Sequence, residues 1–250
     1  MATVDVLLRG FSFSTDAGRP AFCAVTLVES RGRRILVDTA HVGRRRELSA
    51  ALAERGLSEA SIDAVLMTHA HWDHVQNFDR FPQAPLLLHP RERGYASAPH
   101  ENDWATPRWT GVAIETHRIQ EVSEGEELAS GVHVIELPGH SVGSIGLLVE
   151  TEAGTACIAG DAVHSGPVAT SGEPPLVFGS LSQAKESVAR AVSAADVIYP
   201  GHDRPFRITD GAVDYLEPFA LTITNLTPDR EGLRFETPAA STWVMPGAAE

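Results

Sequence analysis

Cysteine is scarce in this sequence of 250 residues, which contains only Cys23 and Cys157. Both lie in apolar, strand-like runs, AFCAVTLV and TACIAG, where a lone cysteine is usually a small buried hydrophobic side chain. The sequence leaves a disulfide between them open. This sparing use of cysteine suits a reducing compartment, and we expect the protein to be cytoplasmic.

Long hydrophobic runs are also missing. No window approaches about 18 uninterrupted apolar residues, the length at which a segment becomes a candidate membrane-spanning helix. The N-terminal stretch MATVDVLLRGFSF has no basic region followed by a long apolar segment, so we expect no signal peptide.

Positive charge is in short supply. Lysine and arginine total 20 against 33 aspartates and glutamates, which gives a formal net charge of −13. A surface this acidic repels the phosphates of nucleic acids and the headgroups of anionic membranes, so neither is expected as a partner. We expect a small-molecule substrate instead, and the sequence leaves a homodimer open.

Apolar residues make up 43% of the chain, enough to bury a substantial core. The length fits one large domain more easily than two, and no repeat, low-complexity tract or linker divides it. We therefore predict a single domain over residues 1–250. It includes a C-terminal extension from about 207 to 250, in which FALTITNL and GLRFETP have the composition of strands.

Strand patterns recur along the chain. From Val4 to Asp38, short β-branched runs are separated by turn residues, and Arg31-Gly32 is a predicted hairpin turn. Further strands are predicted over Ile62–Met67 and over APLLLHP, GVHVIELPGH, SIGLLVETEAGTACIAGD and DVIYPGHDRPF. Residues 91–117 are polar and are predicted to be irregular.

Two helices are predicted from apolar residues at helical spacing. The first covers Arg45 to Arg55 and ends at Gly56. The second lies near Ser182 to Ala194, with Ser180 and Gln183 as a capping box. Each half of the chain thus has several strands followed by helices, which predicts an α/β (α+β) protein with two sheets packed inside two helical layers.

The stretch THAHWDH places three histidines and an aspartate within six positions, directly after a predicted strand. Residues i and i+2 of an extended chain point the same way, so His69 and His71 can grip one cation. If the chain then turns into a helix, Asp73 and His74 face another direction and can grip a second. Imidazole and carboxylate donors without thiolate suit zinc, with iron, manganese and cobalt as alternatives.

Three more candidate ligands lie at predicted strand ends beside glycine, in LPGHS, IAGDA and YPGHD. Loops at strand ends meet at one edge of a sheet, and glycine allows a sharp turn or a close approach there. A catalytic metal takes about three protein ligands and keeps one position open. The predicted sets are His69, His71 and His140 for one metal, Asp73, His74 and His202 for the other, and Asp161 between the two.

Any one of these histidines, taken alone, is more commonly a surface or hydrogen-bonded residue than a ligand. Seven ligand-type side chains in four strand-to-loop settings favour a metal site over coincidence. Two divalent cations and the carboxylates of Asp73 and Asp161 leave a charge of about +2, which would acidify a shared water molecule. We expect the bridging hydroxide to attack a carbonyl carbon, while Asp73 shuttles the proton to the leaving group.

The motifs VDTA, THAHWDH, PGHS, GDA and PGH resemble the metallo-β-lactamase-fold hydrolase superfamily, over roughly Val4 to Phe206. The resemblance implies an αββα four-layer sandwich with a dinuclear metal site at one edge of the sheets. It also implies that Asp38 lies near the ligand loop and supports it from behind. A turn aspartate after a strand is the alternative for Asp38.

Within the superfamily, ELPGHSVGSIGLLVET followed by AGDAVHSG looks most like the acyl-homoserine-lactone lactonase and glyoxalase-II-like branch. True β-lactamases of this fold lack the bridging aspartate, which Asp161 would supply here. Flavo-diiron oxygen reductases carry glutamate where this chain has His71, and nuclease branches would clash with the charge of −13.

The resemblance thus implies a dinuclear-metal hydrolase, with zinc as the expected metal, that acts on a lactone or another small-molecule ester. Two other enzymes stay open, a thioester hydrolase of glyoxalase-II type and a mononuclear iron dioxygenase that acts on sulfur. An inactive binding protein on the same fold is the non-enzyme alternative, although no ligand position is substituted.

Three residues depart from the family pattern. Gln76 and Ala40 stand where glycine is usual, and His164 stands where lactonases often have a substrate-contacting tyrosine. His164 is expected either to contact the substrate or to face solvent. Tryptophans are also candidate substrate contacts: Trp72 as a pocket wall or core residue, and Trp104 and Trp109 as a lid or as surface packing.

Overall fold

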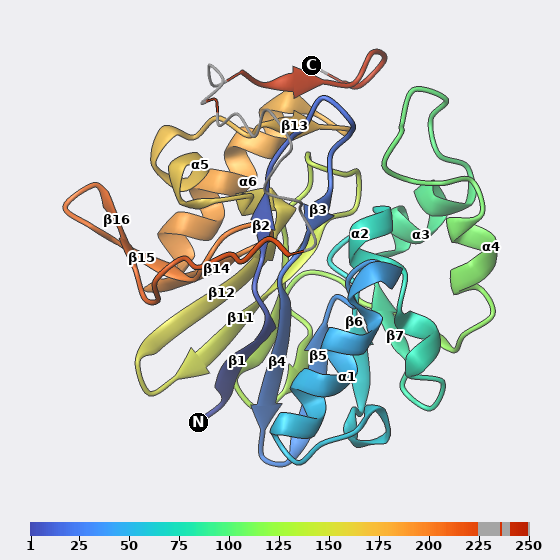
Figure 1. Cartoon of the computed structure of the whole chain (residues 1–250), viewed down its shortest axis with the longest axis vertical. Coiled ribbons are helices and arrows are strands. Elements are labelled where there is room, and N and C mark those ends of the chain that lie inside the picture. Colours follow the sequence, from blue (N-terminus) through green and yellow to red (C-terminus); the bar gives the residue numbers. More distant parts are fainter. Residues whose placement is uncertain (225–235, 237–240, 250) are drawn as a thin grey trace.

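The computed structural model describes residues 1–224, 236 and 241–249. Two β-sheets pack against each other, and helices cover the outer face of each (Figure 1). The predicted αββα sandwich is therefore confirmed. In the described part of the chain, none of the helices is long and apolar enough to cross a membrane.

The first sheet has six strands in the order β1-β4-β5-β6-β7-β8. β4 and β5 form a hairpin through Arg31 and Gly32, both of which have positive φ, as the predicted two-residue turn requires. From β5 to β8 the neighbouring strands are parallel. The strands are β1 (Thr3–Leu8), β4 (Val25–Ser30), β5 (Arg33–Val37), β6 (Ala64–Leu66), β7 (Leu86–Leu88) and β8 (Ile119–Glu121).

The second sheet has seven strands in the order β16-β15-β14-β12-β11-β10-β9. It is antiparallel except where β12 lies beside β14. The strands are β9 (Glu127–Ala129), β10 (Val132–Glu136), β11 (Ile145–Thr151), β12 (Gly154–Gly160), β14 (Val197–Pro200), β15 (Phe206–Thr209) and β16 (Ala212–Tyr215). The first residues of the predicted C-terminal extension thus belong to this sheet.

Two short strand pairs lie outside these sheets. β2 (Phe11–Ser12) pairs with β3 (Ala21–Phe22), and β13 (Leu176–Val177) pairs with β17 (Trp243–Val244). The strand expected over FALTITNL is wrong for residues 219–224, which form no strand. The rest of that segment and most of GLRFETP lie outside the described residues.

Consecutive apolar residues of the first sheet alternate between two cores. Leu36 and Val65 face outward, where they pack with Leu52 of α1 (Arg45–Glu54). Ile35 and Leu66 face inward and pack against the second sheet. Because both faces of the sheet are buried, its parallel strands are continuous apolar runs.

The outer face of the second sheet is covered by α5 (Gly166–Ser171) and α6 (Leu181–Ala194) (Figure 1). Ala191 of α6 packs with Cys157 of β12. The side chain of Ser180 accepts a hydrogen bond from the Gln183 N–H at the start of α6, which is one half of the predicted capping box, whereas the Ser180 N–H donates to the Gly139 carbonyl. Both cysteines are buried and free, so they form no disulfide.

The prediction that residues 91–117 are irregular is wrong, because α3 (Pro90–Ser97) and α4 (Thr110–Ile114) lie there. Pro90 occupies the first turn of α3, and the His89 side chain accepts a hydrogen bond from the Arg91 N–H. The helix buries only Glu92 and Ala96, so it lacks the apolar stripe by which a helix is recognised in a sequence.

Candidate metal centre

The seven candidate ligands lie in four loops that follow strands, and the fold brings these loops together. His69 and His71 follow β6, and Asp73 and His74 lie in α2 (Trp72–Val75). The other three follow strands of the second sheet, His140 after β10, Asp161 after β12 and His202 after β14. All seven are at most 6% exposed.

Three histidines converge on one point. His69 Nε2 lies 3.0 Å from His71 Nδ1, which lies 3.0 Å from His140 Nε2. Nitrogen ligands about 2.0–2.1 Å from a tetrahedral zinc ion would be separated by roughly 3.3 Å. The three ring nitrogens thus have nearly the spacing of ligands around one cation.

A second group consists of Asp73, His74 and His202. Asp73 Oδ2 lies 3.3 Å from His202 Nε2 and 3.7 Å from His74 Nε2. Asp161 lies between the two groups, because its carboxylate is 3.2 Å from His74 Nε2, 3.2 Å from His202 Nε2 and 3.5 Å from His140 Nε2. The predicted division into two sets joined by Asp161 agrees with this geometry.

Hydrogen bonds on the outer side of the rings orient three of the histidines. His140 Nδ1 donates to the Leu176 carbonyl (3.0 Å), His74 Nδ1 donates to Asp38 Oδ2 (2.8 Å), and His69 Nδ1 lies 3.0 Å from Thr68 Oγ1. A proton held on Nδ1 leaves Nε2 as the lone pair that faces the centre. Asp38 therefore lies behind the ligand loop, where the resemblance had put it.

Unpartnered buried atoms test whether these residues fit a metal. Asp73 Oδ2, His74 Nε2 and Asp161 Oδ1 are buried without a hydrogen bond, although His74 Nε2 and Asp161 Oδ1 are only 3.2 Å apart. Buried polar atoms normally have partners, and leaving one without costs about 1–3 kcal/mol. A cation between these atoms would satisfy all three, so the donor set fits a metal.

The charge states of the two groups differ. Burial lowers the pKa of His69 and His140, and that of His71 to about 3, so these rings are neutral, the form that binds a cation. Burial also acts to lower the pKa of His202, but Asp161 and Asp73 outweigh it and raise that pKa to about 10. A cation bound there would displace the His202 proton.

Glycine beside the ligands permits close packing, as predicted. A Cβ on Gly201 would overlap Asp161 Oδ1, and a Cβ on Gly139, whose φ is +123°, would overlap the backbone of Ala184. The His202 and His140 loops therefore need glycine at these two positions.

The predicted substrate contacts divide into those near the centre and one away from it. The His164 ring stacks on His202 with centroids 4.6 Å apart, and it shares a potential ligand cluster with Asp161 and His202. It is thus not a loop histidine remote from the site. Trp72 is half-buried and lies 5.5 Å from the His41 ring.

Trp104 is 49% exposed and packs on Phe178, whose ring lies 4.5 Å from His71. Trp104 is therefore one residue removed from the first histidine group. Trp109 is equally exposed but precedes α4 and makes no ring contact with the cluster within the described residues. The structure does not bring Trp109 to the site.

The two departures from glycine have different consequences. Gln76 Oε1 accepts the Val42 N–H, so its side chain ties α2 to the preceding loop. Ala40 adopts φ +59°, a conformation that costs a residue with a Cβ roughly 1 kcal/mol. Ala40 is fully buried in the outer core of the first sheet.

Sequence reasoning missed two residues beside the centre. Phe178, at the end of β13, packs its ring on His71 and His140. Glu92 of α3 is fully buried and accepts hydrogen bonds from two of the ligand loops, the one that carries His69 and His71 and the one that carries His140. Neither lies in a recognisable motif, and only the three-dimensional contacts identify them.

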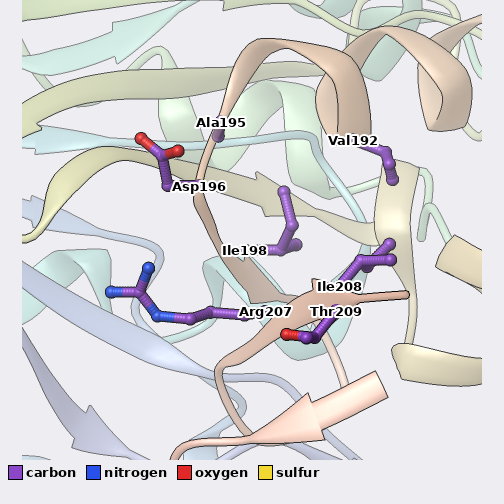
Figure 2. Close-up of a pocket in the computed structure, with 7 residues that line it drawn as sticks. All are labelled: Val192, Ala195, Asp196, Ile198, Arg207, Ile208 and Thr209. Atoms are coloured by element: carbon purple, nitrogen blue, oxygen red, sulfur yellow. The ribbon is translucent and has the colours of Figure 1, made fainter. Parts of the chain in front are cut away.

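A pocket of about 250 Å³ lies away from the candidate ligands. It is lined by Val192, Ala195, Asp196, Ile198, Arg207, Ile208 and Thr209 (Figure 2). Asp196 precedes β14, whereas His202 follows it, so this pocket is at the opposite end of the strand from the candidate ligands. None of the candidate ligands lines it.

The family model described as Metallo-beta-lactamase superfamily matches residues 18–202. Metallo-beta-lactamase domain-containing protein 1 of Xenopus laevis is 34% identical over 214 residues, which cover 82% of this chain and 82% of that protein. An N-acyl homoserine lactonase of Bacillus thuringiensis is 28% identical over 147 residues, 56% of this chain and 55% of that protein.

Solved structures share the fold. A variant of B. thuringiensis AiiA with N-decanoyl-L-homoserine at its active site matches with a TM-score of 0.66 and 19% identity, over 80% of this chain and 92% of that one. AidC, a dizinc quorum-quenching lactonase, matches with a TM-score of 0.61 and 17% identity, over 80% of both chains. At such low identity the similarity concerns the fold alone.

Proposed function

Because this chain belongs to the metallo-beta-lactamase superfamily, we propose that it is a dinuclear-metal hydrolase that cleaves a lactone or another small-molecule ester. The observation that carries the proposal is the pair of donor groups joined by Asp161. Each group supplies three ligands of its own and Asp161 lies within reach of both, so two cations held there would lie side by side, as in a paired catalytic site.

His69, His71 and His140 would hold one cation, Asp73, His74 and His202 the other, and Asp161 both. Zinc suits nitrogen and carboxylate donors without thiolate, and iron and manganese are the alternatives. Two bound cations would supply a deprotonated water for attack on the carbonyl carbon and positive charge for the carbonyl and leaving-group oxygens.

Asp73 is proposed as the proton shuttle. Its Oδ2 faces His202 and His74, so its other oxygen, Oδ1, need not bind a cation. Oδ1 can therefore take up a proton and return it to the leaving alkoxide. This mechanism requires no serine or cysteine nucleophile. Cys23 is also unsuited to that role, because burial raises the pKa of its thiol.

His164 and the aromatic residues near the first group are proposed to orient the substrate. His164 is half-buried beside His202, so its ring can donate a hydrogen bond to a substrate oxygen. Phe178 is buried beside His71, and the more exposed Trp104 and Trp243 pack on it, so the three rings form an apolar wall near the first group. An ester with an apolar substituent would fit such a wall.

Lactones are favoured over other esters by the similarity to N-acyl homoserine lactonases, which extends over 56% of this chain. The similarity to Metallo-beta-lactamase domain-containing protein 1 covers more of the chain, but that name states no substrate. The lactone is therefore proposed from the weaker of the two similarities together with the donor geometry.

The test combines metal analysis with a substrate panel. Purified protein supplemented with zinc should contain about two equivalents of metal and should open lactones, with release of acid measured by a pH indicator. Less than a quarter-equivalent of metal would overturn the dinuclear site. Thioester hydrolysis, or oxygen uptake with one iron per chain, would replace the lactonase by another enzyme, and inactivity of fully loaded protein would favour a binding protein.

A further inference from the structure

Glu92 is a fully buried carboxylate that lies between the two loops that carry the first three histidines. It belongs to the first turn of α3 and is 0% exposed. Its hydrogen-bond donors are all neutral groups, so no cationic side chain among them repays the cost of burying its charge. None of the roles proposed above requires it.

The carboxylate joins segments that are distant in the sequence. Its Oε1 accepts the N–H of Ala70, which lies between His69 and His71, at 2.9 Å. Its Oε2 accepts the Ser141 hydroxyl at 2.7 Å and the Gly143 N–H at 2.9 Å, in the loop that begins with His140. One side chain thus connects the His69–His71 loop with the His140 loop.

Close packing makes these bonds possible. A Cβ on Gly143 would overlap the backbone nitrogen of Glu92, so glycine allows the His140 loop to touch α3. The Ser141 and Ser144 hydroxyls are 2.9 Å apart, which further limits the positions that the Ser141 side chain can take.

We propose that Glu92 is a positioning residue that holds the two loops at the spacing that the first cation requires. The inference rests on the proposed function, since it assumes that His69, His71 and His140 bind a metal. His69 Nε2 and His140 Nε2 each lie 3.0 Å from His71 Nδ1 and gain little from this approach without a cation, so other contacts must hold the two loops together. The three hydrogen bonds that Glu92 accepts are among these contacts.

Replacing Glu92 by glutamine separates this role from simple volume filling. Glutamine has nearly the same shape, but an NH2 group, which donates and cannot accept, replaces one of the two carboxylate oxygens. Either Ala70 or the Ser141–Gly143 pair would then face a donor instead of an acceptor. Glu92→Ala removes all three bonds, and Ser141→Ala removes one of them while Glu92 stays in place.

The experiment titrates metal-free protein with Co²⁺ and follows the visible spectrum, which reports the coordination geometry of each bound ion. One of the two equivalents should bind about 10- to 100-fold more weakly in Glu92→Gln and Glu92→Ala. Ser141→Ala should show a smaller shift in the same direction, and it keeps the test informative if Glu92→Ala does not fold.

Val149→Ala is the matched control, because Val149 is a fully buried core residue of β11 that contacts neither ligand loop through a hydrogen bond. It should bind both equivalents as the wild type does. The inference fails if the Glu92 variants bind both equivalents normally, or if both equivalents weaken equally. A wild-type protein that binds no Co²⁺ would overturn the proposed function itself.

Discussion

Asp38 connects two of the residues around the candidate centre. Its Oδ2 accepts from His74 Nδ1 and from the Thr68 hydroxyl, and its Oδ1 accepts the Thr68 N–H, each at 2.8 Å. Asp38 has φ +60°, a conformation that asparagine also tolerates. The position therefore allows a change in hydrogen bonding without a change in backbone.

Asp38→Asn should weaken metal binding by about 10- to 100-fold. With its oxygen bonded to Thr68, the amide would donate to His74 Nδ1, and the His74 proton would move to Nε2, which faces the metal. A zinc titration against a competing chelator measures the effect. Asp63→Asn, at an exposed position where the Asp63 side chain accepts the Arg34 N–H, is the control and should bind zinc normally. Equal affinities of the two variants would contradict the role of Asp38.

The buried thiol of Cys157 should make the free energy of unfolding depend on pH in the alkaline range. Burial raises the pKa of its thiol from 9.0 to about 12. Because the unfolded thiol ionises first, the stabilising contribution is complete below pH 9 and is lost as pH rises from 9 to about 12.

Cys157→Ala should therefore flatten the pH dependence of the free energy of unfolding in this window, by up to about 1.4 kcal/mol per pH unit. Urea unfolding at pH 7, 9 and 10 provides the measurement. Identical slopes for wild type and variant above pH 9 would show that Cys157 does not contribute, whatever the absolute loss of stability from the smaller side chain.

Single residues also show where sequence reasoning reached its limit. The seven candidate ligands could be predicted because their chemistry is specific and because each follows a strand. Glu92 could not, since its partners are 22 to 51 positions away and a glutamate in a polar stretch is usually exposed.

At the scale of elements, the central strands and α1 could be predicted because each carries its own pattern of apolar residues, whereas β8, β13 and β16 are too short to show one and were missed. α3 carries none, and its stability comes from its first turn and from its contacts with the ligand loops. A helix of this kind is defined by tertiary structure, which a local pattern cannot report.

The β4–β5 hairpin offers a test of local conformation. Arg31 has φ +50°, although residues with a long side chain avoid this region. Arg31→Asn should stabilise the protein by about 0.5–1 kcal/mol, because asparagine followed by glycine is the preferred sequence of this turn. Urea denaturation measures the gain. Arg33→Asn, at the first residue of β5, should give no gain in stability. A gain of similar size there would refute the explanation from backbone conformation.

At the scale of the whole molecule, the centre joins the two sheets. His69, His71, Asp73 and His74 extend from the first sheet, whereas His140, Asp161 and His202 extend from the second. Each of the two proposed metals therefore has ligands from both sheets, and a cation bound there holds the layers together in addition to its part in the reaction.

Removal of metal should consequently lower the global stability. A cation present at about 1,000 times its dissociation constant stabilises the folded state by about 4 kcal/mol, which corresponds to a change in Tm of roughly 8–16 °C for a chain of this size. Differential scanning calorimetry before and after chelation measures this change, and added zinc should reverse it.

In Asp161→Asn, which weakens the connection between the two donor groups, the same treatment should shift Tm by much less. A Tm that is insensitive to chelation in the wild type, with metal shown to be lost, would mean that the sheets are held together without the centre.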